Sequence, residues 1–340
     1  MRAERIENSR HYPKIATMNI VLCYPVEERH IRQIQAAAPH ATVIDAGQEQ
    51  VASKIFEADL FCGHPKVPMD WDGVVRQGRL QWIQSSAAGL DHCLVPAVVD
   101  SGIIVTSASG VLADQVSEHA VALLTSILRS LPTFYQAQQR KEFIRRPTRD
   151  LHHATVGIVG FGGVGRRIAE VMSAFKTRIL ATDMFPIDKP AHVERLLAAD
   201  MLLEMAEAAD ILILAAPLTA QTRGMIDRNV LGRMKPGSIL INVARGPLVV
   251  EDHLVEALES GHLYAAGLDV TQQEPLPATS RLWELPNVII TPHVGGQSFR
   301  RIDQMTDFFC ENLTRWFDKR PLLNLVDKRL GFPVRQPAGR

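Results

Sequence analysis

Short apolar runs, typical of buried strands, alternate along the chain with segments whose apolar residues recur at helical spacing. Residues 27–38 form the first helical segment, which Pro39 ends. The apolar runs of this first part lie at residues 19–23, 42–44, 60–62, 80–84 and 103–106. Strands that alternate with helices predict a parallel sheet covered on both faces. The polar residues 1–16 are expected to form a loose extension.

The same alternation continues beyond residue 113 and is long enough for a second, complete sheet. The helical segments of this part lie at residues 113–128, 166–175, 251–260 and 299–317. Its apolar runs lie at residues 156–159, 179–183, 211–215, 238–243, 265–270 and 288–291. The fold class is therefore predicted to be α/β, with two doubly wound parallel sheets. One domain is expected at 113–296. The other is expected at 1–112, completed by 297–340, because the last helix has no sheet of its own.

A glycine-rich turn follows the strand predicted at residues 156–159. Gly160, Gly162 and Gly165 form the pattern Gly-x-Gly-x-x-Gly directly before a predicted helix. In a dinucleotide-binding turn, the first glycine allows the tight turn, the second lets the backbone approach a pyrophosphate, and the third lets the helix pack on the strand. The N–H groups at the helix start then face the anion. A glycine-rich turn with no ligand gives the same pattern, so the motif alone is weak.

An acidic residue ends the next predicted strand, at Asp183. It lies 183 − 165 = 18 residues after the last glycine of the motif. A carboxylate about 20 residues after the glycines is the one that binds the ribose of NAD. Asp183 on its own is compatible with a solvated loop acid, but turn, helix and acid together predict a dinucleotide site.

Polar residues with useful chemistry follow three later strands. Arg245 offers a planar, permanently charged fork that suits a carboxylate together with a carbonyl oxygen. His293 lies in a glycine-rich turn and is the natural proton donor near neutral pH. Asp269 and Glu274 supply carboxylates, one of which could orient the histidine.

Each of these residues alone has a simpler interpretation. Arg245 could form a surface ion pair, Asp269 could cap a helix, Glu274 could be solvated, and His293 could be hydrogen-bonded within its turn. All four lie at strand ends of a dinucleotide-type sheet, however, and ligands of such sheets bind at the carboxyl ends of the strands. Their joint occurrence therefore favours an active site.

Composition limits the other functions open to the chain. Lys and Arg together number 37, as do Asp and Glu, so the formal net charge is zero, which argues against a general nucleic-acid or anionic-membrane surface. The four cysteines are scattered without a C-x-x-C pair, and no His/Cys/Asp/Glu spacing predicts a metal. The N-terminus lacks the apolar run of a signal peptide, and no stretch is long and apolar enough for a membrane span. We therefore expect free thiols and a cytoplasmic location.

With these residues in view, the sequence resembles the D-isomer-specific 2-hydroxyacid dehydrogenases, among them glyoxylate/hydroxypyruvate reductases and phosphoglycerate dehydrogenases. The resemblance extends over roughly residues 80–330 and its motifs, in order, are highly specific. The matching segments are 85–92, 117–124, 155–165, 217–219, 242–247, 267–277 and 282–296. The resemblance implies a Rossmann NAD-binding domain inserted in a flavodoxin-like substrate domain. It also implies hydride transfer between NAD(H) and a 2-oxo/2-hydroxy acid, in a homodimer with the helix after residue 112 at its interface.

The resemblance also assigns roles to particular residues. Arg245 would hold the substrate carboxylate and carbonyl, His293 would be the acid/base, and Glu274 would be its partner. The amides around Ala88 and Gly89 would bind the substrate carboxylate. Asp269 would contact the nicotinamide carboxamide, and the amides of Gly163 and Val164 would hold the pyrophosphate. The remaining residues expected to line the cofactor are Gly160, Gly162, Gly165, Asp183, Pro217, Val243, Ala244, Gly295 and Gly296.

The chain departs from the family pattern at four positions. The family often has Arg where Gly163 stands, so a charged pyrophosphate contact is missing, and an aromatic residue where Thr271 stands. Related formate dehydrogenases have Gln where this chain has Glu274, and phosphite-oxidising members have Lys where it has Ala88. Formate and phosphite are therefore disfavoured as substrates.

Two questions stay open at the level of sequence. Related transcriptional corepressors keep this fold and much of this site, so an NAD-sensing interaction protein is the alternative to an enzyme. The side chain of the acid is also undetermined, and we expect it to be set by residues 63–66, residues 88–92 and the region of Trp283.

Overall fold

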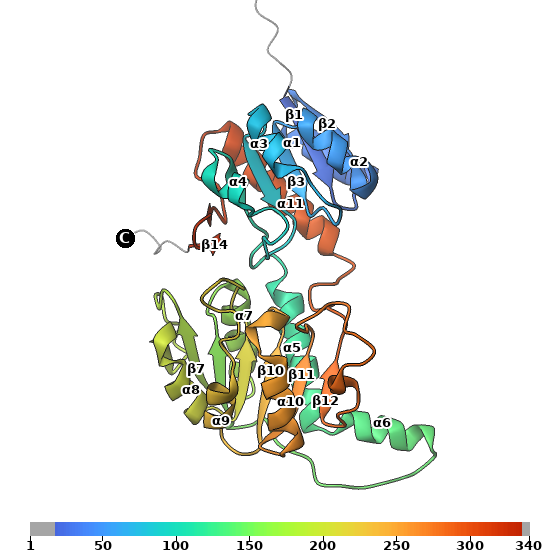
Figure 1. The fold of residues 1–340 in the computed structure, drawn as a ribbon, viewed down its shortest axis with the longest axis vertical. Coiled ribbons are helices and arrows are strands. Elements are labelled where there is room, and N and C mark those ends of the chain that lie inside the picture. The colour runs from blue at the N-terminus through green and yellow to red at the C-terminus, as the bar shows by residue number, and fades with distance from the viewer. Residues whose placement is uncertain (1–17, 335–340) are drawn as a thin grey trace, which may run out of the picture.

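The computed structural model describes residues 18–334, which form two parallel sheets with helices on both faces (Figure 1). The extension expected at residues 1–16 lies outside the described residues. In Figure 1 the five-stranded sheet lies above the seven-stranded one, and α5 (Ala113–Leu128) begins between them. Every strand pair within the two sheets is parallel. The predicted fold class is confirmed.

The first sheet has the strand order β2-β1-β3-β4-β5, which is the flavodoxin-like doubly wound order. Its strands, in that order, are β2 (Ala41–Asp45), β1 (Met18–Cys23), β3 (Leu60–Gly63), β4 (Trp82–Ser85) and β5 (Ile104–Thr106). The helices of this unit are α1 (Glu28–Ala37), α2 (Gly47–Lys54), α3 (Trp71–Gln77), α4 (Pro96–Asp100) and α11 (Arg301–Phe317), with the 3₁₀ helix η1 (Ile55–Glu57) after α2.

Alternate residues of each strand face opposite cores, as the two-residue period of a strand requires. In β1, Ile20 and Leu22 belong to one cluster of buried residues and Val21 to the other. The core that contains Ile20 is completed by Phe309 of α11, near the far end of the chain. The expectation that the last helix crosses back to the first unit is therefore confirmed. Figure 1 shows α11 in red among the blue elements.

The second sheet has the order β12-β11-β10-β9-β6-β7-β8, a Rossmann arrangement with one further strand at its edge. The bounds in that order are β12 (Val288–Ile290), β11 (Leu263–Leu268), β10 (Ser238–Asn242), β9 (Ile211–Leu214), β6 (Thr155–Val159), β7 (Arg178–Asp183) and β8 (Arg195–Ala198). The direction of winding reverses beside β6, which lies between β7 and β9. Ligands of doubly wound sheets bind at such a switch point, outside the carboxyl ends of the strands.

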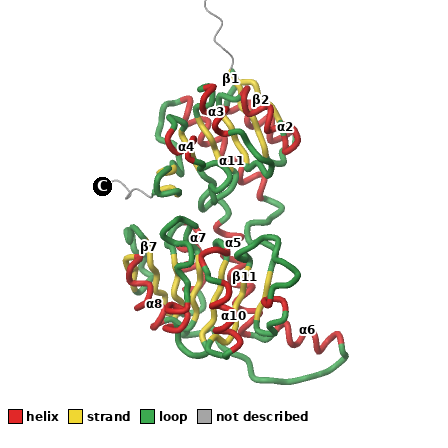
Figure 2. The backbone as a smooth tube through the Cα atoms, viewed as in Figure 1, coloured by secondary structure: helices red, strands yellow, loops and turns green. Residues whose placement is uncertain are grey.

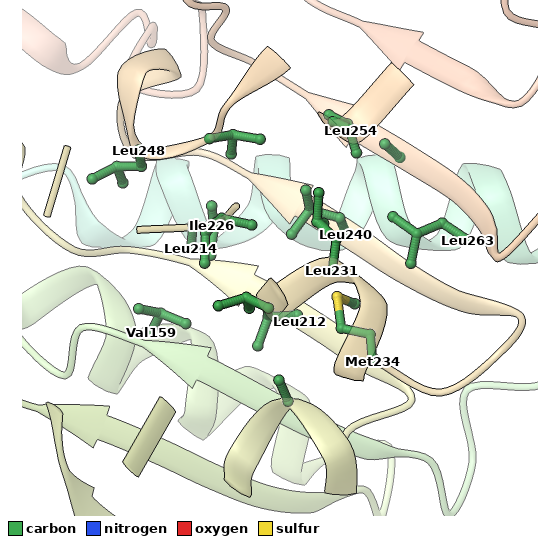
Figure 3. Packing of buried hydrophobic residues seen from close by; sticks show 14 of the residues in the cluster. Val159, Leu212, Leu214, Ile226, Leu231, Met234, Leu240, Leu248, Leu254 and Leu263 are labelled. Carbon is green, nitrogen blue, oxygen red and sulfur yellow. The ribbon is translucent and has the colours of Figure 1, made fainter. Parts of the chain in front are cut away.

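Helices cover both faces of this sheet as well. α5 and α7 (Gly163–Ser173) pack on one face, and α8 (Leu202–Ala208), α9 (Arg228–Arg233) and α10 (Glu251–Glu259) on the other. Figure 3 shows the second face, where Leu212 and Leu240 of neighbouring strands meet Leu231 of α9 and Leu254 of α10. The shorter elements are α6 (Leu131–Gln139), η2 (Ala199–Met201), η3 (Gly246–Leu248), η4 (Arg281–Trp283), β13 (Val326–Asp327) and β14 (Phe332–Pro333).

The structure adjusts several predicted boundaries. The helix expected at 166–175 is α7 and begins at Gly163, so the last part of the glycine motif is its first turn. The strand expected at 265–270 begins at Leu263 and ends at Leu268, which places Asp269 just after it. Edge strand β8 was not predicted, since Arg195–Ala198 is only four residues long and has no run of buried residues. Domain boundaries at 112/113 and 296/297 remain a prediction.

One segment projects from the second unit. α6 and the loop that follows it extend away from the sheet and return to β6, as the tube in Figure 2 shows. In the described part of the chain, no helix is long and apolar enough to cross a membrane.

Candidate active site

The glycine turn after β6 is built by close packing. Gly160 has φ +90°, a region that favours glycine, and a Cβ there would lie 2.5 Å from Cα of Ala216. A Cβ on Gly165 would overlap the carbonyl oxygen of Gly160. Packing within the protein therefore requires glycine at the first and third positions of the motif.

Gly162, the second glycine, has a different environment. No atom lies within 4 Å of the position where its Cβ would stand, so the protein itself does not exclude a side chain there. Gly162 is the N-cap of α7, whose first N–H groups have no partner within the helix and carry its positive partial charge. This turn fits an anionic group such as a pyrophosphate.

Asp183 lies beside this turn, at the end of β7. Its Oδ2 accepts a hydrogen bond of 2.6 Å from the amide of Phe161, within the glycine turn. Its Oδ1 accepts one of 2.9 Å from the amide of Phe185. The carboxylate therefore joins β7 to the turn after β6, where a ribose beside a pyrophosphate would lie.

The other residues predicted to line the cofactor follow the carboxyl ends of neighbouring strands. Parallel strands place these ends at one edge of the sheet, so the structure brings the predicted set together. The residues are Pro217 after β9, Val243 and Ala244 after β10, Asp269 after β11, and Gly295 and Gly296 after β12. Their contacts with a cofactor remain predictions.

A buried carboxylate holds the turn that carries His293. The side chain of Asp269 accepts hydrogen bonds from the amides of Val294, at 2.9 Å, and Gly295, at 2.8 Å. Its backbone carbonyl accepts one of 2.8 Å from the amide of His293. His293 has φ +56°, in the left-handed region, and these bonds fix that conformation. Asp269 is 2% exposed, so the turn is anchored in the protein interior.

His119 of α5 also contacts this anchor, which the sequence did not predict. Its Nε2 lies 2.8 Å from the hydroxyl of Thr291 and 3.2 Å from Oδ1 of Asp269. Because the Thr291 hydroxyl donates to Asp269, it can only accept from His119, which places a proton on Nε2. A histidine within an apolar helix gives no local signal of this contact, since its partners lie 150 to 172 residues away.

His293 and Glu274 form a pair. Nδ1 of His293 lies 2.7 Å from Oε2 of Glu274, and the other carboxylate oxygen accepts a hydrogen bond from the amide of Thr271. Both side chains are partly exposed, with 46% and 40% of their area accessible. The pairing uses Nδ1 and leaves Nε2 as the nitrogen available to a substrate.

Arg245 extends from the loop after β10 to the first unit. Buried Asn242 shapes this loop, donating to the carbonyl of Arg245 and accepting from the amide of Ala244. The guanidinium donates to the Ala244 carbonyl and lies so close to Gly89 that a Cβ there would overlap it. Its Nε lies 3.8 Å from Oδ2 of Asp91.

The amides predicted to bind the substrate carboxylate are therefore beside Arg245. Ala88 and Gly89 lie in the loop after β4, and within the described chain neither backbone N–H donates a hydrogen bond. Ser85 orients this loop through a hydrogen bond with Ala87, and the Ala108 amide donates to the Ala87 carbonyl. Two N–H donors without a partner in the described chain thus lie in the loop that the guanidinium contacts, a suitable arrangement for a carboxylate.

The loop after β3 completes this wall. The rings of His64 and His92 are stacked, with centroids 4.1 Å apart. The side-chain amide of Gln48 in α2 donates to the His64 carbonyl and accepts from the Lys66 amide, which fixes the loop. Burial lowers the pKa of His92 to about 3, so that ring is neutral at physiological pH.

Comparison with known proteins connects this geometry to a family. The model of the D-isomer specific 2-hydroxyacid dehydrogenase NAD binding domain matches residues 121–295. A glyoxylate reductase of Pyrococcus furiosus is 31% identical over 301 residues, which are 85% of this chain and 88% of that protein. The chain belongs to the D-isomer specific 2-hydroxyacid dehydrogenase family.

Other members of the family are similar over different shares of their length. A D-3-phosphoglycerate dehydrogenase of Methanocaldococcus jannaschii is 29% identical over 283 residues, or 83% of this chain, which spans about half (54%) of that protein. The solved structure of a D-isomer specific 2-hydroxyacid dehydrogenase from Xanthobacter autotrophicus, in complex with NADPH and MES, has a TM-score of 0.80 and 27% identity, and the match covers 93% of this chain and all of that one. The family and its dinucleotide-binding domain are thus established for this chain.

The role of Asp269 as an anchor of the His293 turn leads to a testable expectation. Asp269→Asn keeps the shape but replaces one accepting oxygen by an NH₂ group, which then faces an N–H donor. A displaced His293 should lower kcat/KM for 2-oxo acid reduction by roughly a hundredfold, because small misplacements of reacting groups are costly. Steady-state kinetics measure this effect, and a thermal unfolding scan of the same sample reports the folded fraction.

Asp227→Asn is the matched control. Asp227 accepts two backbone N–H bonds at the start of α9, so the same chemical change is made in a similar setting. Its kcat/KM should equal that of the parent. Full activity in the folded Asp269→Asn protein would show that the carboxylate does not position His293.

Proposed function

We propose that this protein transfers a hydride between NAD(H) and a 2-oxo/2-hydroxy acid, as a D-2-hydroxyacid dehydrogenase. The observation that carries the proposal is the 2.7 Å pair of His293 and Glu274, at the strand ends that also present Arg245. The relatives named glyoxylate reductase and D-3-phosphoglycerate dehydrogenase support the reaction class.

We also propose that residues 113–296 bind the cofactor and that residues 1–112 with 297–340 bind the acid. Four free thiols agree with a cytoplasmic location.

Residues at the carboxyl ends of β6 and β7 would hold the pyrophosphate and the ribose of the cofactor. The first turn of α7, from Gly163, would bind the pyrophosphate through backbone N–H groups, and Asp183 would accept hydrogen bonds from the ribose. The unfilled space at Gly162 agrees with this placement. When bound, the nicotinamide supplies the hydride in reduction and accepts it in oxidation.

Arg245 would hold the acid and stabilise charge. Its guanidinium, together with the amides of Ala88 and Gly89, would bind the substrate carboxylate. As the carbonyl oxygen gains negative charge during reduction, a fixed cation beside it lowers the energy of the transition state. The hydrogen bond from Arg245 to the Ala244 carbonyl keeps the fork in one orientation.

His293 would supply the proton. In reduction, Nε2 donates its proton to the developing alkoxide, and in oxidation it removes the proton from the hydroxyl. Glu274 contacts Nδ1 at 2.7 Å, so the ring cannot rotate away and Nε2 stays directed to the substrate. The anchored turn around Asp269 keeps the ring at a constant position.

The alternative is an NAD-sensing, corepressor-like interaction protein of the same fold. The two functions differ in whether NADH is consumed. An NAD-sensing protein binds NADH without oxidising it in the presence of 2-oxo acids, whereas a dehydrogenase oxidises it. The presence of Arg245, His293 and Glu274, with Arg245 already oriented, favours the enzyme.

Replacing His293, the proposed proton donor, and Arg245, which would bind the substrate carboxylate, tests this function. His293→Ala should lower kcat/KM for reduction by roughly 10²–10⁴, the usual contribution of a general acid. Arg245→Lys should also be severely impaired, because an ammonium keeps the charge but loses the two-pronged geometry. NADH oxidation at its absorbance band, with glyoxylate and hydroxypyruvate as substrates, measures both.

His152→Ala, in an exposed histidine pair outside the site, is the control and should retain the activity of the parent. Parental activity of either His293→Ala or Arg245→Lys would contradict the role assigned to that residue.

The cofactor should be NAD rather than NADP. A carboxylate at Asp183 repels a 2′-phosphate, and the next residue, Met184, offers no charge to offset it. Like charges placed together cost several kcal/mol. The Xanthobacter relative was solved with NADPH, so the preference belongs to the individual protein rather than to the fold.

We expect kcat/KM with NADH to exceed that with NADPH by about a hundredfold, and Asp183→Asn to reduce this ratio at least tenfold. Asp188→Asn removes the same charge from an exposed position five residues along and should leave the ratio unchanged. Equal efficiency of the parent with both cofactors would show that Asp183 does not face the ribose.

We also propose that the chain is a homodimer. The projecting segment of α6 and the following loop exposes large apolar side chains, of which Phe143 is 93% and Tyr135 64% accessible. Exposed apolar surface on an extension is typical of an interface with another subunit. The segment follows α5, which the family resemblance places at such an interface.

Analytical ultracentrifugation of the parent should give twice the chain mass of 37.7 kDa. Phe143→Glu should shift the equilibrium to the monomer, because a charge would be buried on association. Phe317→Glu, at the exposed end of α11, is the control and should stay dimeric. A monomeric parent at micromolar concentration would contradict the proposal.

A further inference from the structure

The wall opposite the glycine turn holds more positive charge than a simple 2-oxo acid can neutralise. Three cations, Lys66, Arg245 and Arg301, act on His64, and one carboxylate, Asp91, opposes them. Asp91 is 67% exposed and lies 3.8 Å from Arg245. The single carboxylate of a 2-oxo acid would neutralise Arg245, and within residues 18–334 neither Arg301 nor Lys66 forms an ion pair with a carboxylate.

Arg301 shows this imbalance most clearly. It is the first residue of α11, and its Nε is buried without a hydrogen-bond partner. The one hydrogen bond that its guanidinium makes within the described residues is a long one, 3.5 Å, from Nη1 to the side chain of Gln297. Burial lowers the pKa of its guanidinium, and no carboxylate of the described chain counteracts this effect. A half-buried cation without an anion is costly, so the arrangement favours a ligand that supplies one.

Arg301 lies near the place assigned to the substrate. Arg301 follows His293 by eight residues along the chain, and both Arg301 and Arg245 lower the pKa of His64, after the larger effect of burial. His64 stacks on His92, which closely follows the Ala88–Gly89 amides along the chain. The Gln48 side chain fixes the loop that carries His64 and Lys66. The loops after β3 and β4 thus connect the carboxylate clamp to Arg301.

We propose that the acid handled by this protein carries a second anionic group, a carboxylate or a phosphate, at the end remote from its carbonyl. Arg301 binds that group, with Lys66 beside it, while Arg245 and the amides of Ala88 and Gly89 bind the first carboxylate. This inference rests on the proposed function. It makes Arg301 a residue that determines substrate specificity, and Lys66 a second one.

Matched pairs of substrates test the second anion. Each pair consists of an acid with the distal group and one without it: 3-phosphohydroxypyruvate and hydroxypyruvate, oxaloacetate and 2-oxobutanoate, and 2-oxoglutarate and 2-oxopentanoate. We expect kcat/KM for the dianionic member of at least one pair to exceed that of its partner tenfold or more. Whether the phosphate pair or a carboxylate pair shows the preference identifies the chemistry of the distal group.

Arg301→Gln should reduce this preference by about ten- to hundredfold, the usual effect of losing a charge-assisted hydrogen bond. Arg301→Lys should restore part of it, because the charge remains. Arg300→Gln is the matched control, since it removes the same charge from the exposed neighbour and should keep the preference of the parent. Lys66→Gln, on an exposed loop residue, should also reduce the preference and tests the site independently of the fold of α11.

Turnover of glyoxylate or hydroxypyruvate without a preference for any dianionic acid would overturn this inference and leave the proposed function standing. A preference that Arg301→Gln and Lys66→Gln leave intact would also overturn it. Failure to reduce any of the acids would overturn the proposed function itself, and this inference with it.

Discussion

The contact between the Arg245 guanidinium and the backbone at Gly89 joins the two halves of the site. Arg245 belongs to the sheet that carries the glycine turn, and Gly89 belongs to the other sheet. Because a side chain at residue 89 would occupy the place of the guanidinium, glycine is required there. The contact places a permanent cation beside two backbone N–H donors that have no partner in the described chain. Neither sheet alone presents a carboxylate clamp of this kind.

Polar groups held by buried backbone contacts also position His293, the proposed proton donor. His293 sits in a left-handed conformation within a turn, where a free chain would rarely hold it. The carboxylate of Asp269 receives two amides of that turn and the Thr291 hydroxyl, and His119 lies against it. Buried hydrogen bonds to a charged acceptor are strong, and the cost of breaking them keeps the turn in place. The exposed pair of His293 and Glu274 thus rests on an unexposed support.

Charge balance distinguishes the parts of the site. At the glycine turn, each oxygen of the Asp183 carboxylate accepts one backbone N–H and can accept further hydrogen bonds. On the opposite wall, Lys66, Arg245 and Arg301 outnumber Asp91. Under the proposed function, the cofactor side discriminates against an additional negative charge, whereas the acid side offers cations to a second anionic group. The charges of the two sides together favour a cofactor without a 2′-phosphate and an acid with more than one negative group.

The sequence by itself determined the fold class, the glycine turn and the set of strand-end residues. These depend on local regularities, namely the two periods of apolar residues and the fact that parallel strands place their carboxyl ends at one edge. His293 with Glu274 could be anticipated in this way, as could Asp183 beside the turn. The tertiary structure alone decided that Arg245 meets Gly89, that His119 supports the Asp269 anchor, and that Arg301 has no acidic partner among the described residues. These facts depend on residues up to 172 positions apart being brought together, which no local period encodes. Whether a charge is balanced is a property of its surroundings in space.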